Sequence, residues 1–241
     1  MLWERVLFRL AKLWLSRETL LAMYDPSPQR GPQTPGEKLF VRLLVMAIAS
    51  FLLAELAQDF TPAKLSVLFF FLFWCPLLVL HEAGHALMAW SLGWSVEQIV
   101  IGMGEPLKRF KLGKVPVEWR MVPIEGFVRC RPRNLERPRL KNALVYFAGP
   151  GIELLLAALI LLLVGQRLLQ PSNAVWVIAV QALAAASVAS GVINLIPFSA
   201  ETPDRKIVND GLGILLALFT PKEHYLAQMK AMLAESDQGD R

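Results

Sequence analysis

The chain has 241 residues, of which 55% are hydrophobic and 19% charged, with a mean hydropathy of +0.44 and a formal net charge of +5. This composition argues against an ordinary soluble domain and is typical of a protein that crosses a membrane several times. The positive charge does not indicate a nucleic-acid partner, since no nucleic-acid recognition motif accompanies it.

The N-terminal region, residues 1–38, is predicted to be cytoplasmic and to have two parts. Residues 1–23 place basic side chains on one helical face and Trp3, Leu7, Leu10 and Trp14 on another. This pattern fits a helix in the membrane interface and equally a helix that packs on the protein's own core. Residues 25–37 are rich in Pro and Gly and predict an irregular linker.

Four apolar runs are each about as long as a spanning helix requires, roughly 20 residues. They cover residues 39–57, 65–92, 145–165 and 174–197. We therefore predict an all-α polytopic membrane protein with about four transmembrane helices, the first of which and a short outer loop occupy residues 39–64.

The basic residues indicate the orientation of these spans. Residues 1–38 carry six Lys and Arg and residues 93–144 carry eleven, whereas the connections 57–64 and 166–173 carry one each. Because cytoplasmic loops are enriched in Lys and Arg, we expect both termini and the 93–144 loop to be cytoplasmic. The charge would also attract anionic lipids of the bilayer.

The 93–144 loop predicts a small sheet. Its β-prone segments, broken by Gly and Pro, are 98–101, 107–112, 115–122 and 127–129, with a turn at Gly113 and Lys114. An edge of this sheet could pair with an extended substrate, or the sheet could be a structural cap. Cys75 and Cys130 lie in different settings and are not expected to form a disulfide.

The C-terminal region, residues 219–241, predicts a cytoplasmic amphipathic helix and tail. Thr220-Pro221-Lys222-Glu223 has the pattern of a capping box with Pro at the first helical position, which would begin a helix extending to about residue 234.

The second apolar run contains His81-Glu82-Ala83-Gly84-His85. Two histidines four residues apart lie on one face of a helix and can bind one metal ion. Glu82 lies about 100° around the helix axis, where it can act as a general base on a water molecule. Ionisable side chains are costly inside a membrane, so this group indicates a functional metal site.

The third protein ligand is not fixed by spacing alone. Carboxylates after the fourth run are suitable because that run and the histidine helix are predicted to end on the same side of the membrane. The candidates are Glu201, Asp204 and Asp210, with His224 the less favoured alternative as a surface histidine.

Four passages together resemble the site-2 protease family of intramembrane zinc metalloproteases. They are the His81–His85 motif, Gly102-Met103-Gly104 with Pro123–Val128, Ala148-Gly149-Pro150, and Asn194-Leu195-Ile196-Pro197 with Asp210-Gly211. Their order and their placement in apolar runs carry the resemblance over roughly residues 65–215.

The resemblance implies a metalloprotease membrane core at residues 65–218, formed by three catalytic helices and a β-rich membrane-associated loop. Zn²⁺ would be held by His81, His85 and Asp210, with Glu82 as general base. Asn194 would position the substrate or the hydrated carbonyl, or alternatively cap a helix end. The expected location is the bacterial inner (plasma) membrane.

Two features depart from the family pattern. The interval from Pro197 to Asp210 is long and contains Asp204, although Asp210 is preferred because Gly211 and an apolar run follow it. Glu153 stands where the family pattern has Asn, and it could pair with a basic side chain or stay protonated through burial.

The sequence therefore predicts an intramembrane zinc metalloprotease that cleaves a transmembrane or juxtamembrane segment of a membrane protein near the cytoplasmic face. The alternative is a non-proteolytic scaffold or metal-handling protein that retains the metal site, although retention of Glu82 argues against it. A regulatory membrane partner is compatible with such an enzyme, and the sequence does not set the oligomeric state.

Overall fold

The computed structural model describes residues 35–58, 60–202 and 205–239. The helix predicted over residues 1–23 and most of the 25–37 linker lie outside the described residues, as does Asp204. In chain order the main elements are α3 (Pro35–Ala57), α4 (Leu65–Ser91), β1 (Ser95–Leu112), β2 (Val115–Arg131), α5 (Pro138–Val164), α6 (Val175–Leu195), β3 (Ser199–Thr202), β4 (Arg205–Val208), α7 (Asp210–Phe219) and α8 (Lys222–Gly239).

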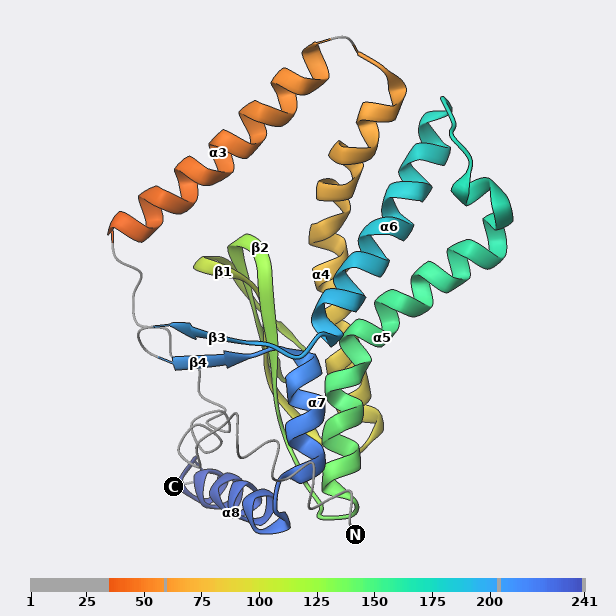
Figure 1. Cartoon of the computed structure of the whole chain (residues 1–241). Coiled ribbons are helices and arrows are strands. Elements are labelled where there is room, and N and C mark those ends of the chain that lie inside the picture. The colour runs from red at the N-terminus through yellow and green to blue at the C-terminus, as the bar shows by residue number, and fades with distance from the viewer. Residues whose placement is uncertain (1–34, 59, 203–204, 240–241) are drawn as a thin grey trace.

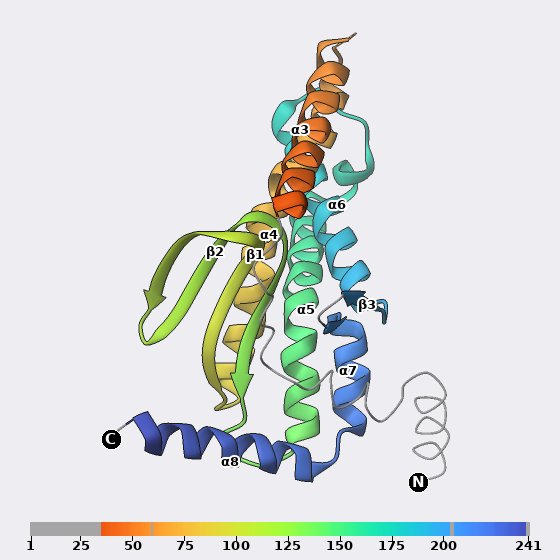
Figure 2. The ribbon, with the colours of Figure 1, turned by 90° about the vertical axis from the view of Figure 1, so that its left-hand side faces the viewer.

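Helices α4, α5 and α6 form the central bundle, and they stand side by side in Figures 1 and 2. With the short 3-10 turns η1 (Pro62–Lys64) and η2 (Gly165–Leu169), the apolar helical stretches 62–91, 138–169 and 175–195 are long enough to cross a membrane. The predicted spans at 65–92, 145–165 and 174–197 thus fall on three such helices, although α5 begins seven residues before its predicted start.

The first predicted span, residues 39–57, falls on α3, which is helical but is not among these three stretches. Figure 1 shows α3 joined to the upper end of α4 and slanting away from the bundle. The count of four transmembrane helices therefore stays a prediction.

The predicted sheet is an antiparallel hairpin whose strands are longer than the segments in the sequence suggested. Strands β1 and β2 meet at the predicted turn, where Gly113 has a φ of 61°. Residues 99–101 of β1 pair with both halves of β2, at 117–119 and at 126–128, so the hairpin folds over itself. Gly102 and Gly104 have φ values of 92° and 89°, which glycine adopts easily, and they allow the strand to continue through this fold.

A cluster of buried apolar side chains lies between α4 and the hairpin. Its members come from α4, β1, β2, α5 and α8 and include Leu78, Ala89, Ile99, Val117 and Tyr225. Helix α8 crosses the lower end of the molecule beneath the hairpin and α5 (Figure 2). The core therefore fixes the hairpin against the half of α4 that carries the histidine motif.

The C-terminal helix α8 is longer than predicted and ends at Gly239 rather than near residue 234. The hydroxyl of Thr220 donates a hydrogen bond to the carbonyl of Leu216 at 2.9 Å, in the last turn of α7. Asn142 donates to the buried hydroxyl of Tyr225 at 3.2 Å and so ties α8 to α5.

Candidate metal centre

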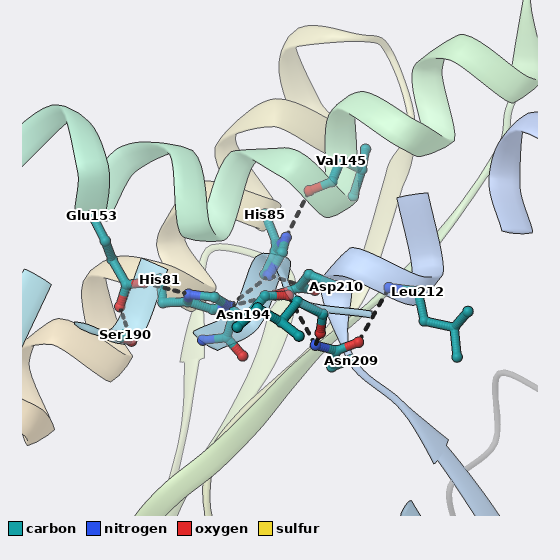
Figure 3. Close-up of polar contacts among 10 residues, drawn as sticks. His81, His85, Val145, Glu153, Ser190, Asn194, Asn209, Asp210 and Leu212 are labelled. Atoms are coloured by element: carbon teal, nitrogen blue, oxygen red, sulfur yellow. Dashed lines mark hydrogen bonds and ion pairs between the residues drawn. The ribbon is translucent and has the colours of Figure 1, made fainter. Parts of the chain in front are cut away.

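His81 and His85 lie one turn apart on α4, and each is 6% exposed. Their rings turn toward each other, with the two Nε2 atoms 3.0 Å apart (Figure 3). The four-residue spacing predicted this shared face, and the packing of α5 encloses it.

Asp210 completes the group from the first turn of α7, 129 residues away from His81 in the chain. Its Oδ2 atom lies 2.9 Å from Nε2 of His81, and its Oδ1 atom lies 3.4 Å from Nε2 of His85. One ligand atom from each of the three side chains falls within 4.8 Å of the others, as a shared metal ion requires.

The other candidates for third ligand are placed differently. His224 lies on α8, where its ring Nε2 is 3.2 Å from Nε2 of Gln228 and burial lowers its pKa. Glu201 belongs to β3 in the hairpin between α6 and α7. Among the residues that the structure describes, only Asp210 joins the two motif histidines in a metal-sized group.

The outer nitrogens of both histidines are already engaged. Nδ1 of His85 lies 2.6 Å from the carbonyl oxygen of Val145, which can only accept, so this nitrogen carries the proton. Nδ1 of His81 lies 3.1 Å from Oε2 of Glu153 and likewise donates to that carboxylate. In the neutral form of each ring, Nε2 therefore presents a lone pair to the space that the two rings share.

This donor set fits a metal ion. Two lone pairs 3.0 Å apart repel each other unless a cation lies between them. The negative charge of the Asp210 carboxylate, 2.9 Å from Nε2 of His81, favours a cation there further. Two imidazoles and one carboxylate are a ligand set that suits zinc and leaves a coordination position open.

Glu82 is buried beside this group, with 3% exposure. Its Oε2 atom has no hydrogen-bond partner among the described residues, which is unusual for a buried carboxylate. A Cβ atom added at Gly126 of β2 would lie 2.5 Å from Oε1 of Glu82, so the hairpin passes directly against this carboxylate. An acceptor without a partner at this point could receive a hydrogen bond from a water molecule.

Glycines allow the close approach that the site needs. A Cβ atom at Gly84 would lie 2.6 Å from the carbonyl oxygen of Ala148, so its absence lets α4 and α5 touch. A Cβ atom at Gly149 would collide with Nε2 of His85 and would lie 2.7 Å from Nε2 of His81. Gly84 and Gly149 both belong to motifs that the sequence analysis singled out.

Asn209 is a residue that sequence analysis missed. Its Oδ1 atom accepts hydrogen bonds from the backbone N–H groups of Leu212 (3.1 Å) and Phe198 (3.0 Å), while Nδ2 donates to the carbonyls of Asn194 (3.0 Å) and Ile196 (2.6 Å). The side chain thus caps α7 and ties it to the end of α6, which holds Asp210 in place. The available signal was an asparagine, a favoured residue at helix N-termini, just before the apolar run that follows Asp210 and Gly211.

Asn194 lies in the last turn of α6 and is half-buried. Figure 3 places it beside Asp210 and His81. The structure therefore brings all five predicted site residues, Glu82, Asn194, His81, His85 and Asp210, to one place.

Comparison with known proteins agrees with this geometry. Residues 69–179 match the family model described as peptidase family M50, the site-2 protease family. The predicted resemblance is confirmed. The M50 match includes His81, Glu82, His85 and Gly149, whereas Asn194 and Asp210 lie beyond it.

Several curated bacterial proteins with the name "Putative zinc metalloprotease" are similar to part of this chain. The protein from Chlamydia trachomatis is 36% identical over 86 residues, which are 36% of this chain and 11% of that protein. The relative from Clostridium perfringens is 32% identical over 104 residues, or 39% of this chain and 31% of its own. The one from Campylobacter jejuni is 28% identical over 141 residues, or 53% and 35%.

The chain thus spans about a third or less of the length of these relatives. The M50 match and the apolar helices α4, α5 and α6 point to a membrane protein.

Proposed function

We propose that this chain is a zinc-dependent endopeptidase that hydrolyses a peptide bond in a transmembrane or juxtamembrane segment of a membrane protein. The observation that carries this proposal is that His81 and His85 of α4 meet Asp210 of α7, a helix far away in the sequence, with the buried carboxylate of Glu82 beside them. A purely structural metal site has no need of that additional carboxylate.

Zinc is the proposed metal, held by His81, His85 and Asp210. The names of the relatives and the ligand set both favour it. When bound in such a site, zinc supplies Lewis acidity and makes a water molecule acidic enough to attack at neutral pH.

Glu82 is proposed as the general base. Its free Oε2 atom would accept a proton from the attacking water and then deliver that proton to the leaving amine. Asn194, at the end of α6, would orient the carbonyl of the scissile bond.

A substrate helix hides its carbonyls in internal hydrogen bonds, so the scissile segment must be extended when it binds. The part of β2 around Gly126 passes against Glu82 and pairs with β1. Pairing of an extended substrate with this sheet is therefore the proposed binding mode.

The proposed orientation follows the basic residues. The hairpin and its flanks, residues 93–144, carry eleven Lys and Arg and lie at the end of the bundle that holds the site. By the positive-inside rule this end would face the cytoplasm of a bacterial inner membrane. Helix α3 would be a fourth span, and a regulatory membrane partner could control substrate access.

The test compares wild type with Glu82→Gln in two measurements. Elemental mass spectrometry of the purified proteins should find about one zinc ion per chain in both, because the substitution leaves the three ligands intact. Profiling of the termini of membrane proteins in cells that carry each form should find new termini only with wild type. Wild type without zinc, or identical termini in both cells, would contradict the proposal, and the second result would favour the scaffold.

A further inference from the structure

Glu153 is a carboxylate with no exposed surface, on the spanning helix α5. Such a group is costly inside a protein unless its oxygens have partners. Both do: Oε2 lies 3.1 Å from Nδ1 of His81 on α4, and Oε1 accepts a hydrogen bond from Ser190 on α6 at 2.8 Å. Figure 3 shows this chain of contacts across the three helices.

The contact with His81 determines which of its nitrogens faces Asp210. While Nδ1–H donates to Glu153, the lone pair of His81 is on Nε2, the atom that points to Asp210 and His85. If the ring were free to change tautomer or rotate, that lone pair could turn away from the shared space. A hydrogen bond to the outer nitrogen of a ligand histidine fixes both properties.

The two histidines differ in how they are held. His85 donates to a backbone carbonyl, that of Val145, which no side-chain substitution can remove. His81 depends on the side chain of Glu153, and the orientation of that carboxylate in turn depends on Ser190. The orientation of His81 is therefore sensitive to how α4, α5 and α6 pack.

We propose that Glu153 is a positioning residue that holds His81 in the metal-binding tautomer and, through Ser190, couples the metal affinity to the packing of the three helices. This inference rests on the proposed metal site and adds to it a residue outside the ligand set. The observed partners of Glu153 are His81, one of the proposed zinc ligands, and Ser190.

The experiment measures the zinc dissociation constant of the purified full chain by competition with a chromogenic chelator. Glu153→Leu should weaken zinc binding by about 10–100-fold, the usual cost of losing such a partner. Glu153→Gln should weaken it by no more than about threefold, because the amide oxygen can still accept from Nδ1–H. Ser190→Ala should have a measurable effect between these two.

Ser187→Ala is the matched control. Ser187 lies on the same helix as Ser190 and is also buried, but its hydroxyl donates to Leu183 within its own helix at 2.8 Å. The zinc affinity of this variant should equal that of wild type. Melting temperatures of all variants after zinc removal show whether a change in affinity reflects lost structure.

Zinc binding by a folded Glu153→Leu variant that is as tight as in wild type would overturn the inference while leaving the proposed function intact. If that variant does not fold, Glu153→Asp takes its place, since it keeps the charge but withdraws the carboxylate from His81. Undiminished affinity there would overturn the inference equally. Wild type that binds no zinc would instead overturn the proposed function itself.

Discussion

The two halves of α4 belong to one apolar run but differ in their surroundings. The first half, residues 65–76, consists mainly of Phe and Leu, and Phe71 and Leu72 are 50% and 60% exposed. The second half, residues 77–91, contains all of the buried residues of this helix, including both histidines and Glu82. The first half has no buried residue, and lipid can cover its exposed side chains, whereas the second half packs against α5 and the hairpin.

This difference shows that an apolar run locates a span but not a site. Lipid satisfies an apolar side chain as well as protein does, so the first half needs no tertiary partners. The second half carries ionisable groups, and these need specific partners at defined distances. Substitutions in the second half, or in residues that contact it, should therefore have large effects on zinc binding or stability. Substitutions in the first half should have small effects.

The largest effect is expected from loss of a ligand. His85→Ala removes one of the three donors, and zinc content should fall from about one per chain to near zero, since a catalytic site has only three protein ligands. His224→Ala is the control and should retain the metal, because His224 lies on α8. Elemental mass spectrometry measures both, and zinc loss from the His224 variant would mean that the ligand set differs from the one proposed.

A matched pair of leucines tests the two halves directly. Leu77 is 3% exposed, and Leu77→Ala should lower the free energy of unfolding by about 2–5 kcal/mol through lost burial and a cavity. Leu72→Ala, five residues earlier in the exposed half, should change it by less than about 0.5 kcal/mol. Unfolding titrations in the same detergent compare them, and equal losses would show that protein covers the first half as well.

Gly149→Ala, on α5, should disturb the proposed histidine ligands on the neighbouring helix α4. The added methyl group would collide with Nε2 of His85, and overpacking of this kind costs about 1–3 kcal/mol. Zinc affinity should fall together with stability. Gly151→Ala is the control, because the nearest atoms to its Cβ would belong to the ring of Phe147, at 3.0 Å, which can move. Chelator competition and thermal unfolding distinguish the two, and similar behaviour would argue against the close packing at Gly149.

Asn209→Ala should have the smallest effect of the four. It removes the cap of α7, which costs about 0.5–2 kcal/mol, and it frees the segment that presents Asp210. A moderate loss of zinc affinity should accompany this change. Asn134→Ala, which removes only a side-chain contact with Lys141, is the control. Unchanged zinc affinity in the Asn209 variant would show that Asp210 is held by packing alone.

Much of the architecture was predictable because its signals are local. Apolar runs of spanning length gave three helices, and glycine with a polar neighbour gave the hairpin turn at Gly113. The length of β1 and β2 was not predictable, because Gly102 and Gly104 are ordinarily strand breakers and here act inside a continuous strand. Pairing of residues 99–101 with both halves of β2 is a long-range choice that no local pattern encodes.

By itself, the sequence determined that His81 and His85 share a helix face, that Glu82 lies beside them and that the helix is apolar enough for a membrane. These properties follow from helix periodicity and composition. Only the tertiary structure decided that Asp210 joins the histidines, that Glu153 and Val145 fix their tautomers and that Asn209 secures α7. Those contacts join residues up to 129 positions apart, and their distances depend on how α4, α5, α6 and α7 pack together.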